Sequence, residues 1–418
     1  MSCVRLSKHD MSGPSSSNYG VVIVGGGPAG ASAAIHLAAR GVRVLLVEQK
    51  KFPRAKLCGE FISPECLDHF ARLGVADRMM KAGGARLSET IFYARSGSSI
   101  SVPSEWFGAR GEALGLSRAE MDHRLLRRAH DAGADALEDA QATGLIIEGG
   151  RVRGVRLRAS GEEFECSSLV VVDATGRRRA LARDVEREEN NGRHARRKRR
   201  ASLVAFKIHL EGARGAEGGC EIYSYRGGYG GLSRVEGGLS NLCFIASARD
   251  VRACGSDPEK VLREVLMTNR RAAYTLDRAR PASQWLSVAL ESFGRRTVVP
   301  ADGLLAVGDA ASFIDPFTGS GILMALESGE LVADVIARWL PHISEGEPFG
   351  PLACEYRALY YERFKTRLRV CTLLRRAAFV PGLAEVVIST LGASERVRRR
   401  LARATRRASL RAARDAAG

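Results

Sequence analysis

Three glycines near the N-terminus have the spacing of a phosphate-binding turn. Gly25, Gly27 and Gly30 follow an apolar run rich in β-branched residues and precede an alanine-rich stretch that ends at Gly41. Gly25 allows a tight turn, Gly27 lets the backbone approach a pyrophosphate, and Gly30 lets helix and strand pack closely. The helix N-terminus would offer free N–H groups and a positive dipole end to the phosphates. The pattern predicts a dinucleotide site.

An acidic residue lies at the expected distance beyond this turn. A second apolar run, 42–47, ends in Glu48, where a ribose hydroxyl would need a hydrogen-bond acceptor. The alternative is a glycine-rich turn without function. Because the preceding strand, the following helix and the acid are all present, the pattern is more specific than three glycines alone.

Two later runs fit the same chemistry. A buried apolar strand is expected to end in Asp173-Ala174-Thr175-Gly176. Another apolar strand is expected to end at Gly308-Asp309, and a glycine-opened helix follows Gly319-Ser320-Gly321. Parts of one nucleotide-binding unit are therefore spread along the chain, and the elements between them must form a separate layer.

These runs resemble the FAD-dependent oxidoreductases of the aromatic-hydroxylase and geranylgeranyl-reductase superfamily. The motifs that carry the resemblance span about residues 20–340. It implies an α/β fold, in which an inserted antiparallel β-sheet substrate domain interrupts a discontinuous, Rossmann-like FAD-binding domain, with a helical C-terminal tail. It implies FAD as the cofactor. No second GxGxxG follows a strand and opens a helix, so NAD(P)H is expected as a transient electron donor, with a separate reductase as the alternative.

The resemblance also assigns residues to the cofactor. The three glycines would hold the pyrophosphate, Glu48 the adenosine ribose, and Asp309 the ribityl or pyrophosphate region. Arg118 matches a family arginine at the start of a helix. A helix opened at Gly321 would stabilise negative charge on reduced flavin by ~0.3–1 kcal/mol. The full expected set is Gly25, Gly27, Pro28, Ala29, Gly30, Glu48, Gln49, Arg54, Cys58, Gly59, Arg118, Ala142, Asp173, Ala174, Gly176, Gly308, Asp309, Pro316, Gly319, Ser320, Gly321 and Ile322.

Four residues are candidate catalytic groups. Cys58 belongs to a Cys-Gly pair that resembles a flavin-proximal segment of the geranylgeranyl-reductase branch, although a small thiol often simply packs. Glu60 and His209 are the polar candidates for proton handling, and Tyr229 lies in the inserted sheet. The alternative for His209 is a hydrogen-bonded structural role. No hydrolase triad or metal-ligand cluster stands out.

The expected domains follow from these assignments. Alternate apolar residues in the inserted sheet are expected to form the substrate face or, alternatively, an ordinary core: Val204, Phe206, Ile208, Tyr223, Tyr225, Tyr229 and Phe244. The expected boundaries are a disordered leader at 1–18, the FAD-binding domain at 19–84, 115–200 and 299–340, the substrate domain at 85–114 and 201–298, and a helical C-terminal region with an arginine-rich tail at 341–418.

Composition limits the location and partners of the protein. The 418 residues carry a net charge of +17, concentrated in 177–200, with eleven Lys/Arg and four Asp/Glu, and 396–414, with nine Arg and no acid. These segments are expected to be solvated or to contact an anionic membrane surface or an acidic carrier protein; without interleaved aromatics, no nucleic-acid partner is expected. Nine scattered cysteines and no hydrophobic signal core favour the cytoplasm, including a peripheral position at the inner membrane face.

The sequence favours a monooxygenase that hydroxylates or epoxidises a hydrophobic small molecule, such as a polyketide, an aromatic or a lipid-like compound, with NAD(P)H and O₂. The main alternative is geranylgeranyl-reductase-like reduction of isoprenoid double bonds. It is weakened because an aromatic Tyr-x-Trp-x-Phe-Pro run of prenyl reductases is replaced at 228–235, where only Tyr229 remains. A flavin-dependent halogenase is less expected, since Trp106, Trp285 and Trp339 are isolated. A non-redox scaffold is opposed by the intact glycine motifs.

Overall fold

The computed structural model describes residues 18–107, 110–189, 201–290, 293–378 and 394–404, together with the single positions 388, 390 and 392. Nearly all of the expected leader, the basic segment from 190 to 200, the expected helix break at 381–382 and the tail beyond 404 lie outside the described residues.

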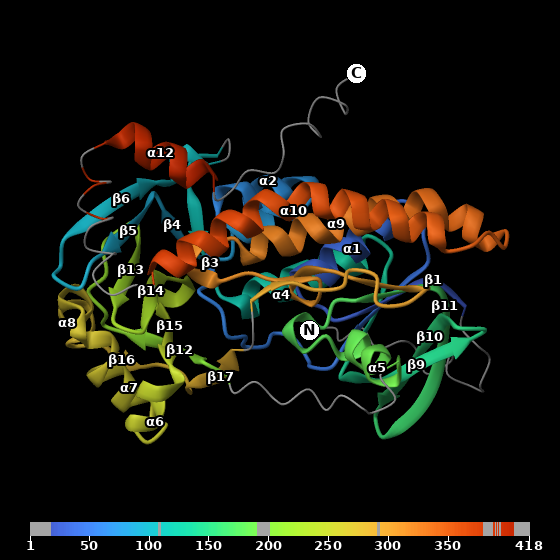
Figure 1. The fold of residues 1–418 in the computed structure, drawn as a ribbon, viewed down its shortest axis with the longest axis horizontal. Helices are drawn as coiled ribbons and strands as arrows, with labels where there is room; N and C mark the ends of the chain where they lie inside the picture. Colours follow the sequence, from blue (N-terminus) through green and yellow to red (C-terminus); the bar gives the residue numbers. More distant parts are fainter. Residues whose placement is uncertain are drawn as a thin grey trace.

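The first of two large sheets contains the strands that flank the glycine turn (Figure 1). Five of its strands run parallel, and a hairpin extends one of them into an antiparallel edge. The parallel strands are, in spatial order, β8 (Asp135–Glu138), β2 (Val44–Glu48), β1 (Tyr19–Val24), β11 (Glu162–Asp173) and β19 (Leu304–Ala306). The hairpin strands are β9 (Ala140–Glu148) and β10 (Arg151–Ala159).

Both faces of this sheet are covered, which explains why its central strands carry continuous apolar runs, Val21–Val24 in β1, Val44–Val47 in β2 and Leu169–Val172 in β11. Val21 and Ile23 face one core, and Val22 and Val24 face the other. The second core is closed by the hairpin and α5 (Ala180–Glu189). The first core is covered by helices α1 (Pro28–Ala38), α2 (Pro64–Arg72), α3 (Ala76–Met80), α4 (Arg118–Asp131), α9 (Gly321–Ser344) and α10 (Gly350–Ala378).

Buried His69 of α2 gives this helical layer a pH dependence. Burial lowers the pKa of His69 to about 4, although Glu330 of α9 lies 3.4 Å from Nδ1 and acts in the opposite direction. The unfolded chain therefore binds more protons than the native state between the two pKa values, and stability must rise with pH there. We expect the free energy of unfolding to fall by roughly 3 kcal/mol between pH 7 and pH 4 through this group. Denaturant titrations of wild type and His69→Gln at several pH values check this. If the free energy of unfolding changes with pH equally in the two proteins, the expectation is contradicted.

The second large sheet is antiparallel apart from one parallel pair, which confirms the inserted antiparallel layer. Its path comprises β16 (Arg280–Pro281), β12 (Leu203–Glu211), β15 (Ser240–Ser247), β14 (Gly228–Arg234), β13 (Gly219–Tyr225), β5 (Glu89–Tyr93) and β6 (Ser99–Pro103), with β17 (Leu286–Leu290) beside β12. Smaller sheets join β3 (Phe61–Ile62), β7 (Ala113–Gly115) and β4 (Ala85–Leu87), and β18 (Gly294–Arg295) with β20 (Ser312–Phe313).

The two faces of the second sheet have different partners. One face packs against α6 (Ala248–Ala253), α7 (Pro258–Glu264) and α8 (Arg270–Leu276). The other face is turned toward the first large sheet and its helices. For most members of the expected set the alternative, an ordinary core, is therefore confirmed, and the substrate face is wrong for them, because their side chains point toward the helices. The members in that core are Val204, Phe206, Ile208, Tyr223, Tyr225 and Phe244.

Among the described residues, no helix has the length and hydropathy needed to cross a bilayer. The C-terminal α12 (Glu395–Ala404) lies against β6 at one end of the second sheet (Figure 1).

Candidate functional site

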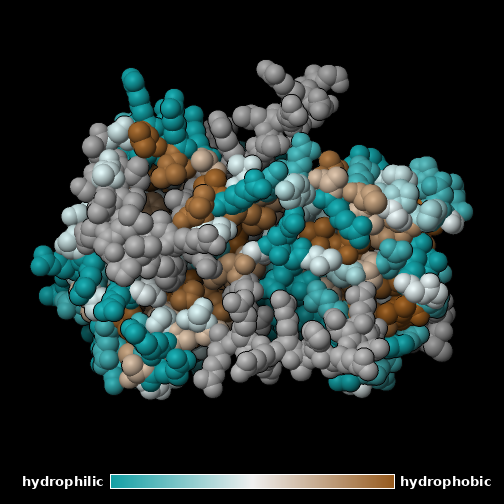
Figure 2. All heavy atoms as spheres, in the orientation of Figure 1, coloured by the Kyte–Doolittle hydropathy of each residue, from teal (hydrophilic) through white to brown (hydrophobic). Residues whose placement is uncertain are grey.

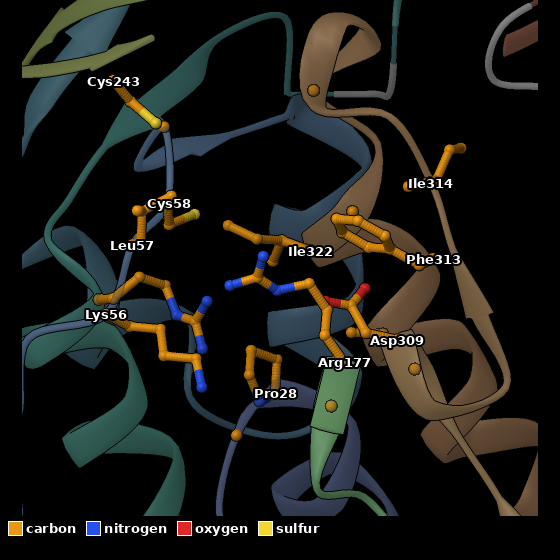
Figure 3. Close-up of a pocket in the computed structure, with 18 of the residues that line it drawn as sticks. Pro28, Lys56, Leu57, Cys58, Arg177, Cys243, Asp309, Phe313, Ile314 and Ile322 are labelled. Carbon is orange, nitrogen blue, oxygen red and sulfur yellow. The ribbon is translucent and has the colours of Figure 1, made fainter. Parts of the chain in front are cut away.

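A cavity of about 660 Å³ lies between the two large sheets. One end is formed by the glycine turn, β2 and the turn after β11, and the other by β5, β6, β13, β15 and α12. Figure 3 shows Cys58, Arg177, Asp309 and Ile322 around its middle. The residues predicted for the cofactor and those of the second sheet therefore share one space.

The glycine turn has the geometry that its spacing predicted. Gly25 has φ +115°, and a Cβ on it would lie 2.3 Å from the Ala174 oxygen. A Cβ on Gly30 would lie 2.0 Å from the Gly25 oxygen, so Gly30 acts in packing and does not line the cavity. Gly27 caps α1 without a side-chain hydrogen bond, and a Cβ there would meet only Arg118 Nη2 at 3.8 Å. Its open side leaves the N-terminus of α1 accessible to an anion.

The Glu48 carboxylate lies at the end of β2, in the cavity wall. It accepts hydrogen bonds from the backbone N of Gly26 at 2.9 Å and of Lys50 at 3.1 Å. Arg54 joins it to Asp122, with nitrogen–oxygen distances of 3.2 Å to each carboxylate. A carboxylate has about four acceptor positions, so Glu48 keeps acceptor capacity for a ribose hydroxyl.

Two further predicted contacts lie near the Glu48 end of the cavity. Gln49 and Ala142 both line the cavity, from the end of β2 and from β9. The Gln49 side chain also accepts a hydrogen bond from Arg178 at 3.5 Å. The structure thus brings both residues to the same part of the wall as Glu48.

Arg118 is held rigidly at the first position of α4. Its Nε and Nη2 donate to the two carboxylate oxygens of Asp122 at 2.8 and 2.7 Å. Ser117 caps the helix by accepting from the backbone N of Glu120 at 3.2 Å. Because such a bidentate pair fixes the guanidinium plane, Arg118 is fixed in place in the cavity wall.

Asp173 does not line the cavity, contrary to its predicted role as a cofactor contact. One of its oxygens accepts from the backbone N of Thr175 at 3.0 Å and from Thr175 Oγ1 at 2.6 Å. The other accepts from Ala182 N at 3.0 Å. Its carboxylate therefore fixes the turn after β11, and this turn places Ala174 and Gly176 in the wall.

Asp309 lies in the cavity with an arginine that the sequence did not single out (Figure 3). Burial raises the pKa of Asp309, while the positive charges of Arg177, Arg118 and Lys56 act to lower it. Gly308 also lines the cavity, and its N–H donates to Ser328 at 2.9 Å. Arg177 follows the Asp-Ala-Thr-Gly turn directly, and this position was the available signal for it.

The run from 316 to 322 brings the N-terminus of α9 to the cavity. Pro316 begins a short 3-10 turn, and Gly319, Gly321 and Ile322 line the cavity. Ser320 is buried outside the cavity wall, with its hydroxyl 3.4 Å from the Thr318 oxygen.

Polar side chains of the second sheet donate hydrogen bonds to the backbone of the segment that carries Cys58. Asn241 Nδ2 donates to the Cys58 oxygen at 3.1 Å, and Ser233 Oγ to the Gly59 oxygen at 3.3 Å. Both Cys58 and Gly59 line the cavity. The sheet therefore fixes the backbone of the Cys58 segment in the cavity wall.

Glu60 and His209 are brought into direct contact. His209 Nε2 lies 2.6 Å from one oxygen of Glu60, while buried Lys207 forms an ion pair with the other. The backbone N of Arg118 also donates to Glu60 at 2.8 Å. Sequence reasoning missed Lys207, although a charged residue two positions before His209 in an apolar strand was a usable signal.

Tyr229 has a clear structural partner. Its hydroxyl donates to Asp315 at 2.5 Å, and its ring lies edge-on to Phe317 with centroids 5.0 Å apart. Burial, followed by the charge of Asp315, raises the pKa of Tyr229 well above its usual value. The phenol therefore stays protonated, and it lines the cavity as a hydrogen-bond donor already engaged with Asp315.

The polar half of the cavity has the chemical groups that FAD requires. The open N-terminus of α1 and the nearby side chains of Arg54, Arg118 and Arg177 suit a pyrophosphate. Arg54 Nε is buried without a hydrogen-bond partner in the described chain, which leaves a donor for a bound ligand. No group of three metal-ligating side chains occurs within the ranges that the structure describes.

Comparisons with curated proteins point in the same direction. The chain is 30% identical to a menaquinone reductase of Mycolicibacterium smegmatis, over 76% of both chains. It is 28% identical to a digeranylgeranylglycerophospholipid reductase of Methanosarcina mazei, over 76% of this chain and 74% of that one.

Solved structures share the fold. A flavin-dependent brominase has a TM-score of 0.77 at 21% identity, covering 93% of both chains. A geranylgeranyl bacteriochlorophyll reductase-like protein of Thermoplasma acidophilum has a TM-score of 0.70 at 21% identity, covering 91% of this chain and 93% of that one. A family model described as an FAD binding domain matches residues 18–340. The chain therefore belongs to the FAD-binding domain family and is an FAD-dependent oxidoreductase.

Proposed function

We propose that the protein reduces a carbon–carbon double bond in an extended, isoprenoid-like substrate. The observation that carries this proposal is the continuity of one cavity, whose polar half suits FAD and whose other half is apolar. The apolar half is lined by Phe92, Ile100, Val102, Phe107, Ile222, Ile245, Leu290, Ile388 and Leu401. These side chains offer a long hydrocarbon a surface without competing hydrogen bonds.

The curated relatives support this choice of reaction. One of the two relatives is a menaquinone reductase and the other a digeranylgeranylglycerophospholipid reductase. Bound FAD would supply hydride transfer, with NAD(P)H proposed as the transient electron donor. The protein's part is to hold the substrate against the segment of Cys58 and to exclude water from the apolar half.

Monooxygenation of a hydrophobic small molecule is the second candidate. It is favoured by the departure from the prenyl-reductase aromatic run in β14, where Gly230 and Gly231 follow Tyr229. Without the larger side chains, Tyr229, Cys243 and Ile245 form this part of the wall. An apolar, water-poor pocket is also what oxygen transfer requires.

Oxygen dependence separates the two reactions. The purified, FAD-loaded protein is reduced with NADPH under anaerobic conditions and mixed with menaquinone or a geranylgeranyl lipid. Flavin reoxidation by the substrate is expected for the reductase, with a product that has gained two hydrogens at an isoprenoid carbon–carbon double bond and not only at the quinone ring. Substrate conversion that occurs only with O₂, with one oxygen atom gained, would reject the reductase in favour of the monooxygenase.

We further propose that the arginines of α12 contact an anionic membrane surface, from which a lipophilic substrate would enter. One side of the helix faces the molecule: Leu401 and Ala402 line the cavity, and Arg403 donates to the Trp106 oxygen at 3.3 Å. Arg396, Arg399 and Arg400 are exposed, so the outward face is mainly cationic, although Val397 is also 54% exposed. Figure 2 shows hydrophilic side chains beside apolar ones at this end of the molecule.

Replacing Arg396, Arg399 and Arg400 together with glutamine is expected to weaken binding to anionic vesicles by on the order of 100-fold, since each arginine near such a surface contributes ~1 kcal/mol. All three side chains are exposed. Vesicle co-sedimentation at low and high salt measures the effect.

A matched control removes three exposed arginines of the second domain, Arg252, Arg263 and Arg278. This control should bind vesicles as the wild type does. If both triple variants lose the same affinity, the contact is a property of net charge and not of α12. An acidic carrier protein would be indicated instead if neither variant alters vesicle binding but the α12 variant loses the carrier.

A further inference from the structure

A chain of titratable groups leads from the surface of the second sheet into the cavity. The side chain of His209 is 18% exposed, whereas that of Glu60 is 1% exposed. The two are joined by the 2.6 Å contact between His209 Nε2 and Glu60. Glu60 itself lines the cavity. The pair therefore connects solvent to the interior through a single side-chain contact.

The surroundings of Glu60 keep its carboxylate ionised. Burial alone would raise the pKa of Glu60, but the hydrogen bond with His209 and the ammonium group of Lys207 lower it below its usual value. The backbone N of Arg118 donates to the same carboxylate. The thiols of Cys58 and Cys243 are the other titratable groups near this cluster. At neutral pH Glu60 is thus an ionised carboxylate held by three hydrogen-bond donors.

Either proposed reaction consumes one proton that the hydride donor does not supply. Alkene reduction places a hydride on one carbon and a proton on the other. Monooxygenation converts substrate, O₂, NAD(P)H and a proton into oxygenated substrate, NAD(P)⁺ and water. Resting on the function proposed above, we propose that this proton enters the cavity from solvent through His209 and Glu60.

The transfer runs through the 2.6 Å contact between His209 Nε2 and Glu60. His209 first takes a proton from solvent at its other ring nitrogen and then gives its Nε2 proton to the Glu60 carboxylate, so the imidazole passes through its cation. Proton exchange with solvent then restores the starting tautomer. Glu60 then releases the proton into the cavity and returns to the ion pair with Lys207. The alternative is that the cluster only fixes the segment that carries Cys58, since Lys207 also donates to the Lys56 oxygen at 3.1 Å.

Reoxidation of the reduced holoprotein by O₂ tests the route without knowledge of the substrate. Anionic reduced flavin, O₂ and one proton yield oxidised flavin and hydrogen peroxide, so the reaction needs the same proton. The protein is photoreduced and mixed with O₂ in water and in D₂O, and flavin absorbance is followed. His209→Gln and Glu60→Gln are each expected to slow reoxidation at least tenfold, the order of a lost general acid.

Imidazole separates proton delivery from a structural role. In His209→Ala, added imidazole is expected to restore most of the rate, with a larger solvent isotope effect than in wild type. The FAD dissociation constant of both glutamine variants and the melting temperature of His209→Gln should stay close to wild type. Glu60→Gln is expected to lower the melting temperature, because it leaves the buried ammonium group of Lys207 without its carboxylate. The matched control is His342→Gln, because His342 makes an exposed contact of 3.2 Å with Glu347 away from the cavity; it should change nothing.

The outcomes are distinct. Wild-type rates and isotope effects in both glutamine variants would overturn the proton route while leaving the flavoenzyme intact. Slowed reoxidation with weakened FAD binding and no rescue by imidazole would overturn the proton route. It would show instead that the cluster only fixes the segment that carries Cys58. A protein that cannot be loaded with FAD would overturn the proposed function, and the proton route with it.

Discussion

A Gly27→Asp variant is expected to fold as stably as the wild type and to lose FAD. Gly27 caps α1 with an extended backbone that any residue adopts, and an aspartate is a favourable residue at this position. Its carboxylate would occupy the open side of the turn, where the pyrophosphate is expected, and would repel it. We expect FAD affinity to fall at least 100-fold, equivalent to ~3 kcal/mol.

Denaturant unfolding and FAD titration measure the two effects separately. The free energy of unfolding should change by less than ~0.5 kcal/mol, since replacement of glycine at a helix cap has small effects. Gly350→Asp is a matched control at the exposed start of α10, where a Cβ meets no atom within 4 Å. It should leave FAD affinity unchanged. Retained flavin in Gly27→Asp would show that the cofactor does not lie across the N-terminus of α1.

An Ile222→Trp variant is expected to keep FAD and to lose substrate turnover. Ile222 lies in the apolar half of the cavity, opposite Gly231 on the neighbouring strand. An indole there would occupy the space proposed for the hydrocarbon without reaching the glycine turn. We expect kcat/KM to fall about 100-fold or more, which corresponds to ~2.7 kcal/mol of lost transition-state stabilisation.

The assay compares anaerobic reoxidation of the reduced flavin by menaquinone in the two proteins. Flavin reduction by NADPH should be similar in both, because the polar half is unchanged. Ile147→Trp is the matched control, since Ile147 is 42% exposed near the end of β9 and, unlike Ala142 of the same strand, does not line the cavity. Normal turnover in Ile222→Trp would place the substrate elsewhere.

The sequence was sufficient for the fold because its strongest signals were local. An apolar strand, a glycine turn and a helix over residues 20–38 gave β1 and α1, and the helix expected from Ser117 is α4. The antiparallel second sheet was expected from short alternating runs separated by glycines. Each signal depends on neighbouring residues only, so tertiary structure did not need to be known.

The predicted cofactor set was identified through backbone requirements. Gly25 and Gly30 are positions where a side chain cannot be accommodated, and such positions are visible as motif glycines. Asp173 was misassigned because a motif does not show which side of a turn its side chain faces. Its carboxylate points back to Thr175 and Ala182.

The residues of the apolar half of the cavity could not be predicted from the sequence. Alternating apolar residues in a strand define two faces of the sheet but do not show which element packs on each face. Phe206 and Phe244 belong to the helix-covered core, while the less apolar Ala205 and Cys243 line the cavity. Which face meets the first domain is decided by the packing of α6, α7 and α8. Lys207 was missed for the same reason, since its partner Glu60 lies 147 positions away in the chain.

The most direct test of a shared cavity is the visible spectrum of the purified protein during titration with an isoprenoid quinone. The account predicts a yellow protein with about one FAD per chain, whose flavin absorption shifts on quinone binding while FAD stays bound, and whose shift is lost in Ile222→Trp. A protein that cannot be reconstituted with FAD, or a quinone that displaces FAD, would contradict it.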